Sequence, residues 1–172
     1  MNDNILLSPH FKLSEFVASR KAREHGINNT PPDEAVENLR ALCEHTLEPL
    51  REGLGLPVII TSGFRTKTLN DMLAHSSDRS QHMAGQAADF YVGHTESTEN
   101  TEKASRRELL IKAFREILQN PAIDFDQLIL YPSFIHVSYV SRERNRRGIL
   151  KAQGNGKLGY GRLTLANALK LT

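Results

Sequence analysis

The sequence has no tryptophan, a single cysteine and no long apolar run. With Cys43 alone, the chain cannot form an internal disulfide or a cysteine-rich zinc cluster. A transmembrane helix needs about 18 to 20 consecutive apolar residues, and no stretch comes close. Residues 1–9 lack the basic region and the apolar run of a signal peptide, so we expect the chain to be cytoplasmic as synthesised.

The composition, 39% apolar and 24% charged over 172 residues, predicts one soluble domain, 1–172, with a sizeable core, and we expect a monomer. The charge is uneven, because residues 142–172 hold eight Lys or Arg against one acid, Glu143. Such a segment either attracts polyanions or is simply a solvated end. No nucleic-acid motif or interleaved aromatic residues accompany it, so we expect no nucleic-acid partner.

Apolar periodicity and turn residues indicate alternating helices and strands. We expect helices from Ser14 to about 23, from about 33 to 53 with Pro49 kinking the last turn, over 68–73 and over about 102–119; and strands over 57–61, 89–92, 126–131 and 134–140, the first of them buried. Cys43 falls on the apolar side of the second helix and is expected in the core. Beyond Arg147 glycines interrupt the pattern, and no form is predicted for residues 158–171.

Residues 80–90, Ser-Gln-His-Met-Ala-Gly-Gln-Ala-Ala-Asp-Phe, hold a histidine and a carboxylate seven positions apart. On one helix, His82 and Asp89 would lie about 10 Å apart along the axis, too far to share an ion with bonds of about 2.0–2.2 Å. A shared metal therefore requires the chain to double back, which Gly85 permits. His136, on a later predicted strand, offers a third ligand. Two histidines, one carboxylate and an open position for water are typical of catalytic zinc.

Spacing alone leaves other interpretations open. A lone histidine in an apolar strand is more often an ordinary core or surface residue than a metal ligand. Two further histidines, His25 and His75, lie in polar connecting segments, and we expect neither to bind metal. A soluble domain without any metal therefore remains an alternative at this level.

The stretch 80–89 closely resembles the Ser-x-His-x-x-Gly-x-Ala-x-Asp motif of the zinc D-alanyl-D-alanine peptidases. These include D,D-carboxypeptidases, D,D-dipeptidases, phage endolysins and the related hedgehog domain. The match extends to 61–65, Thr-Ser-Gly-Phe-Arg, and to 135–138, Ile-His-Val-Ser, in the family's order. The opening 11–16, Phe-Lys-Leu-Ser-Glu-Phe, is similar to the small single-domain branch. Together the resemblance covers about 9–147, followed by the basic segment.

The resemblance implies an α+β fold in which helices pack on a small, largely antiparallel sheet with zinc on its face. It implies Zn²⁺ bound by His82, Asp89 and His136. The implied reaction is hydrolysis of a peptide bond involving D-amino acids in peptidoglycan, as a D,D-carboxypeptidase or an endolysin-like endopeptidase. The partner would be a stem peptide or D-Ala-D-Ala-like peptide, which a cytoplasmic chain reaches only if released, for example through a holin.

The same resemblance implies roles for residues near the histidines. Arg65 follows a glycine at a strand end, where its guanidinium would bind a substrate carbonyl or carboxylate and stabilise developing charge. Without the resemblance, a surface salt bridge is the alternative. Ser80 and Gln81, next to His82, are predicted to contact substrate.

At the positions where the family carries the general base, this sequence departs from the family pattern. Many relatives carry Asp or Glu three residues before the last histidine, where this chain has Ser133, and the small branch often has Glu where this chain has Tyr131. The nearest carboxylate, Asp126, is an odd number of residues from Tyr131, so on a regular strand only one of them faces the zinc. We favour Tyr131, which can donate a hydrogen bond but is a poor base at its ordinary pKa of about 10. A zinc-bearing module that binds wall peptides or a protein with little or no cleavage is therefore the alternative function.

Overall fold

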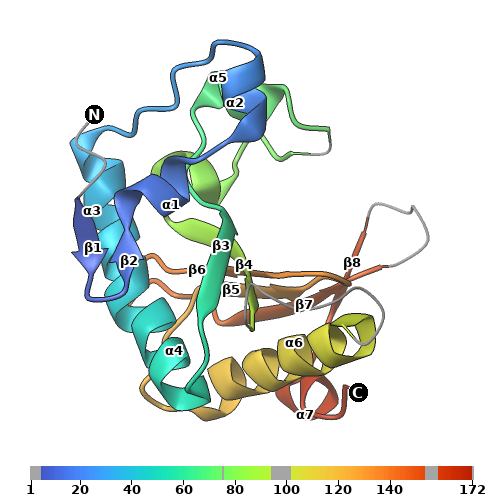
Figure 1. Cartoon of the computed structure of the whole chain (residues 1–172). Coiled ribbons are helices and arrows are strands. Elements are labelled where there is room, and N and C mark those ends of the chain that lie inside the picture. Colours follow the sequence, from blue (N-terminus) through green and yellow to red (C-terminus); the bar gives the residue numbers. More distant parts are fainter. Residues whose placement is uncertain (1–4, 75, 94–101, 154–158, 172) are drawn as a thin grey trace.

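The structure is a computed structural model that describes residues 5–74, 76–93, 102–153 and 159–171 (Figure 1). His75 and most of the polar stretch after Gly93 lie outside the described residues. The first half of the chain is mainly helical and the second half supplies most of one sheet. Within the described residues, no helix has the length and apolar character needed to span a membrane.

The chain begins with a small hairpin and two short helices, where one helix was predicted. Strands β1 (Leu6–Ser8) and β2 (Phe11–Lys12) pair antiparallel and lead into α1 (Leu13–Val17) and α2 (Arg20–Glu24). Helix α1 starts at Leu13, one residue before the predicted start at Ser14, with Lys12 as its N-cap. Extended backbone at Ala18 and Ser19 separates the helices, and Ser19 Oγ caps α2 by accepting from Ala22 N.

The long second helix is continuous but widened in its middle. Helix α3 (Asp33–Leu42) passes through a π-helical turn, η1 (Cys43–Leu47), into α4 (Glu48–Leu54). Pro49 has no N–H to donate, which leaves the carbonyl of His45 without a helical partner. That carbonyl instead accepts from Asp124 N at 3.0 Å. The proline follows the wide turn directly, as the second residue of α4, and Cys43 is fully buried as expected.

A six-stranded sheet forms the centre, in the order β3-β4-β6-β5-β7-β8. Its strands are β3 (Val58–Ser62), β4 (Ala87–Val92), β5 (Gln127–Leu130), β6 (Ile135–Ser138), β7 (Gly148–Ala152) and β8 (Tyr160–Arg162), with α5 (Lys67–Asp71) and the 3₁₀ turn η2 (Gln81–Ala84) between β3 and β4. Every neighbouring pair is antiparallel except β5 and β7, which are parallel. The predicted α+β fold with a largely antiparallel sheet is confirmed. The prediction of a buried first strand is wrong, since β3 is an edge strand in which only Val58 is buried.

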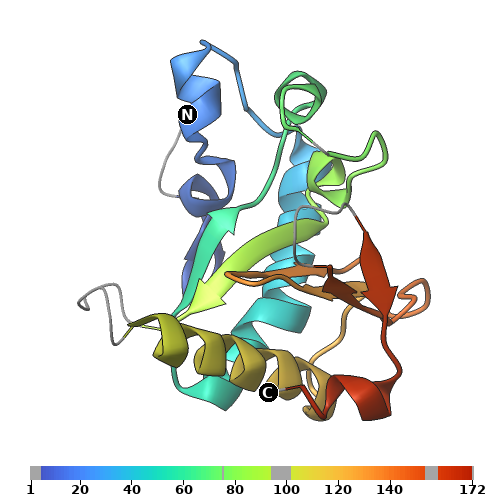
Figure 2. The same ribbon diagram turned by 90° about the vertical axis from the view of Figure 1, so that its right-hand side faces the viewer.

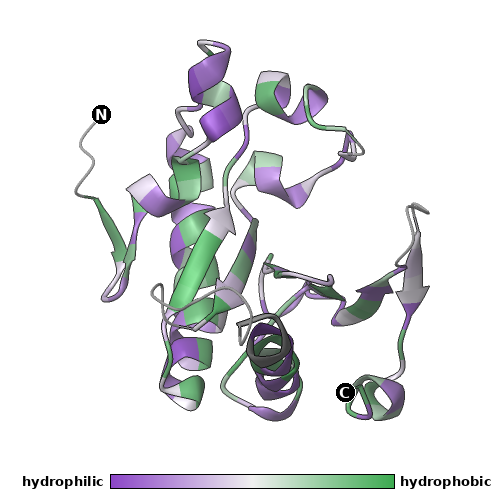
Figure 3. Ribbon diagram, turned by 45° about the vertical axis from the view of Figure 1, so that its right-hand side comes forward, coloured by the Kyte–Doolittle hydropathy of each residue, from purple (hydrophilic) through white to green (hydrophobic). Residues whose placement is uncertain are grey.

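Helices cover the sheet face that carries Phe90, Val137 and Leu128. Helix α6 (Glu102–Gln119) packs against β4 and α4, and it turns buried Leu110, Phe114 and Ile117 inward. Figure 3 shows the resulting alternation of hydrophobic and hydrophilic bands along α6. The core thus occupies one face of the sheet, and the other face carries Asp89 and His136.

The segment beyond Arg147 extends the sheet. Strand β7 pairs with β5, β8 pairs with β7, and the chain then turns into α7 (Leu165–Ala168), which lies beside α6 in both views (Figures 1 and 2). The guanidinium of Arg115 on α6 donates to Leu171 O at 2.7 Å, and this hydrogen bond attaches the segment after α7 to α6. Part of the basic segment therefore belongs to the sheet, and no apolar periodicity in the sequence had predicted these strands.

Candidate metal centre

The turn that carries His82 folds back as the sequence predicted. Gly85 ends η2 in the left-handed region, at φ 69°, which glycine adopts without strain. A β-carbon at Gly85 would also collide with the backbone carbonyl of Ala35 on α3. The turn thus packs closely on α3 and places His82 next to the start of β4, with 3% of its surface exposed.

The sheet register brings the other two predicted ligands together. Asp89 on β4 lies directly opposite His136 on β6, so both side chains point to the same face of the sheet. One ligand atom from each of His82, Asp89 and His136 lies within 4.8 Å of the other two. Among the described residues, this is the one group of three such side chains close enough to share an ion.

The donor atoms fit a tetrahedral zinc ion. His82 Nε2 lies 3.2 Å from His136 Nδ1 and 3.3 Å from Asp89 Oδ1, and His136 Nδ1 lies 2.8 Å from Asp89 Oδ1. Tetrahedral ligands with bonds of about 2.0–2.1 Å are separated by roughly 3.3 Å, close to two of these three distances. The chemistry of the set, two imidazoles and one carboxylate, is that of catalytic rather than structural zinc sites.

A fixed tautomer of His82 strengthens this fit. His82 Nδ1 lies 2.6 Å from the carbonyl oxygen of Gly63, which can only accept, so Nδ1 carries the proton. Burial lowers the pKa of His82, although Asp89 opposes the shift, and this favours the neutral ring. The lone pair on Nε2 then faces the carboxylate oxygen of Asp89, another acceptor. A cation between these atoms resolves the conflict, and the carbonyl supplies the outer hydrogen bond typical of histidine ligands.

The carboxylate of Asp89 is ionised and lies between the two histidines on one side and Arg65 on the other. Burial alone would raise the pKa of its carboxyl, but the two histidines outweigh burial and hold that pKa below its usual range. Its second oxygen, Oδ2, accepts from Arg65 Nη2 at 3.1 Å. The two oxygens are thus divided between the histidines and Arg65.

Arg65 forms an ion pair with Asp89 inside the candidate site, and not the surface salt bridge that was the alternative to a role in binding substrate. Both side chains are largely buried, at 14% and 13% exposure, and Arg65 Nε also donates to Ser62 Oγ at 3.1 Å. Burial lowers the pKa of Arg65, against the pull of Asp89. The arginine can therefore orient the carboxylate of Asp89. Its predicted role toward substrate stays a prediction.

Tyr131 follows β5 directly, and alternation from Ile129, the partner of His136, puts it on the same sheet face as the histidine. Its ring stacks on Phe134 with centroids 4.2 Å apart, and its hydroxyl lies 2.8 Å from the hydroxyl of Tyr160 on β8. Burial, followed by the contact with Tyr160, raises the pKa of Tyr131 above its usual value. The phenol thus stays protonated and is suited to donate a hydrogen bond rather than to act as a base.

Asp126 precedes β5 and is enclosed by partners, with 1% of its surface exposed. Arg146 forms an ion pair with it and donates from Nε at 2.9 Å and from backbone N at 2.8 Å, and Gln81 Nε2 donates at 2.9 Å. Although burial raises the pKa of Asp126, these hydrogen bonds lower it further than burial raises it. The carboxylate is a poor base because its lone pairs are occupied. Of the two residues predicted to contact substrate, Gln81 binds Asp126, and Ser80 is the N-cap of η2.

Three contributors to the site were not identified from the sequence. The carbonyl of Gly63 fixes His82, Arg146 neutralises Asp126, and Tyr160 holds Tyr131. A backbone carbonyl leaves no signal in a sequence. Arg146 and Tyr160 lie beyond the motifs, in the segment whose strands were not predicted.

Two buried histidines and a carboxylate on one face of an α+β sheet form a group that could hold a metal ion, as in metal-dependent hydrolases. The comparison with family models gives the particular family, because the model described as Peptidase M15 matches residues 9–138, and the chain belongs to this family. The resemblance stated from the motifs is thereby confirmed. No curated protein matches the chain. Membership makes the chain peptidase-like, in a family that typically depends on zinc and acts on peptide-type substrates.

Proposed function

We propose that the chain is a zinc metallopeptidase that hydrolyses a peptide bond involving D-amino acids in peptidoglycan, as a D,D-carboxypeptidase or an endolysin-like endopeptidase. The observation that supports it is the convergence of His82 Nε2, Asp89 Oδ1 and His136 Nδ1 within hydrogen-bond distance of one another, in a chain of the Peptidase M15 family. These three residues would hold the zinc. When bound, zinc polarises a carbonyl and lowers the pKa of a bound water toward 7.

The remaining side chains would position substrate and stabilise charge. Arg65 orients Asp89 through Oδ2, and its guanidinium is placed to attract a substrate carbonyl or carboxylate on the same face. The protonated hydroxyl of Tyr131 is a hydrogen-bond donor for the oxygen that gains charge during attack. Ser80 and Gln81 would line the approach beside His82.

One observation favours a second function, in which the zinc domain binds wall peptides or another protein and cleaves slowly or not at all. A peptidase of this kind needs a base to take a proton from the attacking water. The carboxylate of Asp126 already accepts hydrogen bonds from Arg146 and Gln81. The position that carries Glu in similar chains holds Tyr131. The binding function would retain zinc but lack efficient turnover.

Metal analysis combined with digestion of purified peptidoglycan tests both functions. We expect one zinc per chain, its loss in His82→Ala and His136→Ala, and zinc-dependent release of new amino groups from the wall. His25→Ala is the matched control, since His25 is exposed at the C-cap of α2. Identification of the released products gives the bond that is cut.

Full zinc occupancy in both site variants would disprove the ligand assignment. Zinc binding without any released amine, while the protein still pelleted with peptidoglycan, would establish the binding function instead.

A further inference from the structure

The sheet register extends the face that carries the candidate zinc site to the far edge strand. His136 on β6 lies opposite Ile129 on β5, Ile129 opposite Leu150 on β7, and Leu150 opposite Arg162 on β8. Residues paired in this way point to the same face, so Arg162 lies on the face of His136. Three strand spacings of about 4.8 Å put the two Cα atoms roughly 14 Å apart.

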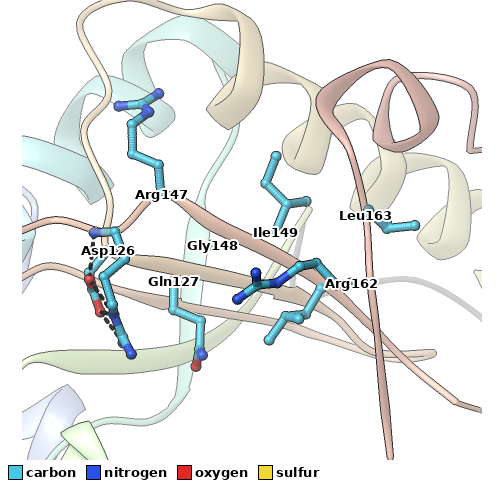
Figure 4. A pocket seen from close by; sticks show the side chains of 9 residues that line it. Asp126, Gln127, Arg147, Gly148, Ile149, Arg162 and Leu163 are labelled. Atoms are coloured by element: carbon cyan, nitrogen blue, oxygen red, sulfur yellow. Dashed lines mark hydrogen bonds and ion pairs between the residues drawn. The ribbon is translucent and has the colours of Figure 1, made fainter.

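A pocket of about 220 Å³ lies at the Arg162 end of this face (Figure 4). Its lining includes Gln127, Gly148, Leu150 and Arg162, together with the ion pair of Asp126 and Arg146. In Figure 4 the guanidinium of Arg162 extends from β8 toward Gln127 on β5. The pocket thus offers a guanidinium and a side-chain amide across β7.

Arg146 connects this pocket to the candidate zinc site. Its guanidinium lines the pocket and also donates from Nη2 to Gln81 Oε1 at 3.4 Å. Gln81 directly precedes His82 in η2. A ligand that lies across β5 and β7 on this face could therefore contact the zinc site at one end and the pocket at the other.

The charges around the pocket leave one cation without a counterion. Asp126 is neutralised by Arg146. Arg147 pairs with Asp124 at 2.9 Å, stacks over Phe125 and points to the other side of the sheet in Figure 4. Arg162 is exposed, and among the residues that the structure describes it forms no side-chain hydrogen bond or ion pair.

The geometry points to a carboxylate subsite at Arg162 and Gln127 that recognises an acidic group of the substrate peptide away from the scissile bond. An extended peptide advances about 3.3–3.6 Å per residue, so four residues cover the roughly 14 Å between the two ends. A guanidinium matches a carboxylate with two parallel hydrogen bonds. This subsite rests on the proposed function for its substrate, and it makes β8 a determinant of specificity.

Two synthetic stem peptides test the subsite, one with a free glutamyl α-carboxyl group and one with that group as a carboxamide. We expect the zinc-loaded protein to bind the free acid more tightly, and Arg162→Gln to weaken that binding about fivefold, as for a partly exposed charged hydrogen bond. Binding of the carboxamide should not change. If the peptides are cleaved, the same change should appear in KM and not in kcat.

Lys151→Gln is the matched control, because Lys151 lies next to Leu150 on β7, is exposed and points to the opposite face. Equal affinity for both peptides, or equal losses in Arg162→Gln and Lys151→Gln, would overturn the subsite. Binding is measured by titration, so the subsite is tested even if neither peptide is cleaved. In that event a carboxylate preference that depends on Arg162 upholds the subsite, while the peptidase function fails.

Discussion

The motif resemblance implies a glutamate at the position where this chain has Tyr131, and the surroundings of this tyrosine keep its hydroxyl protonated. The raised pKa and the contact with Tyr160 suit a hydrogen-bond donor. We predict that Tyr131→Phe lowers turnover of peptidoglycan about two- to tenfold, the range for one neutral hydrogen bond. Tyr131→Glu should raise turnover, since it adds a base on the correct face. The measurement is the initial rate of amine release at equal zinc content.

Asp126→Asn is the companion variant for this prediction. Because Asp126 binds Arg146 and Gln81, its replacement should reduce stability and leave the rate per folded, zinc-loaded molecule nearly unchanged. Abolished turnover in a stable, zinc-loaded Asp126→Asn protein would make Asp126 the base and reject the assignment to Tyr131.

Among the elements, the turn η2 decides whether His82 reaches the sheet. We predict that Gly85→Ala destabilises the fold by more than the roughly 1–2 kcal/mol of a left-handed alanine, because the new methyl group meets the carbonyl of Ala35. Zinc affinity should fall as well, since relief of the collision moves His82. Thermal unfolding and zinc titration measure the two effects.

Gly55→Ala is the control that separates the cost of a left-handed backbone from the cost of the collision with Ala35. Gly55 has φ 63°, nearly that of Gly85, but a β-carbon there meets nothing within 4 Å. We expect it to cost only the backbone strain and to leave zinc binding intact. Equal destabilisation by both substitutions, with unchanged zinc affinity, would contradict the close packing of η2 on α3.

The same elements show what the sequence could and could not predict. His82, Gly85 and Asp89 form a local motif, and strand alternation sets the face of His136, so spacing could suggest these ligands and the family resemblance could favour them over the alternatives. The partners Gly63 and Arg146 depend on a long-range approach of backbone and side chains, which no spacing encodes. Strands β7 and β8 were missed because their short, glycine-flanked segments acquire their form by long-range pairing, β7 with β5 and β8 with β7.

At the scale of the whole molecule, the structure shows where several basic residues of segment 142–172 lie. The basic residues beyond 141 were expected either to attract polyanions or to form a solvated end. The fold instead builds Arg146 into the site and places Arg162 on its face, while Arg147 pairs with Asp124. Part of the charge is therefore internal to the structure, and Arg162 is left for a ligand.

The carboxylate of Glu48, which is 8% exposed, is one of the groups that join the N-terminal hairpin to the long helix. Ser8 Oγ and the backbone N of His10 donate to its Oε1 at 2.6 and 2.9 Å, and His10 Nδ1 lies 2.7 Å from Oε2. Burial raises the pKa of Glu48, but these hydrogen bonds outweigh it and the net shift is downward. The ionised form therefore stabilises the folded state.

A group with a depressed pKa contributes stability that is present above its unfolded pKa, about 4.3 for Glu, and is lost as the pH falls through its folded pKa. We predict that Glu48→Gln lowers the free energy of unfolding at pH 7 by about 1–3 kcal/mol, the range for hydrogen bonds to a charged group. The difference from the unsubstituted protein should shrink as the pH falls below about 4. Denaturant unfolding at pH 7 and pH 3 measures it, with Glu52→Gln, at an exposed position of α4, as the control. A difference that persists undiminished at pH 3 would show that Glu48 acts through packing, because protonation removes the charge but leaves the side chain in place.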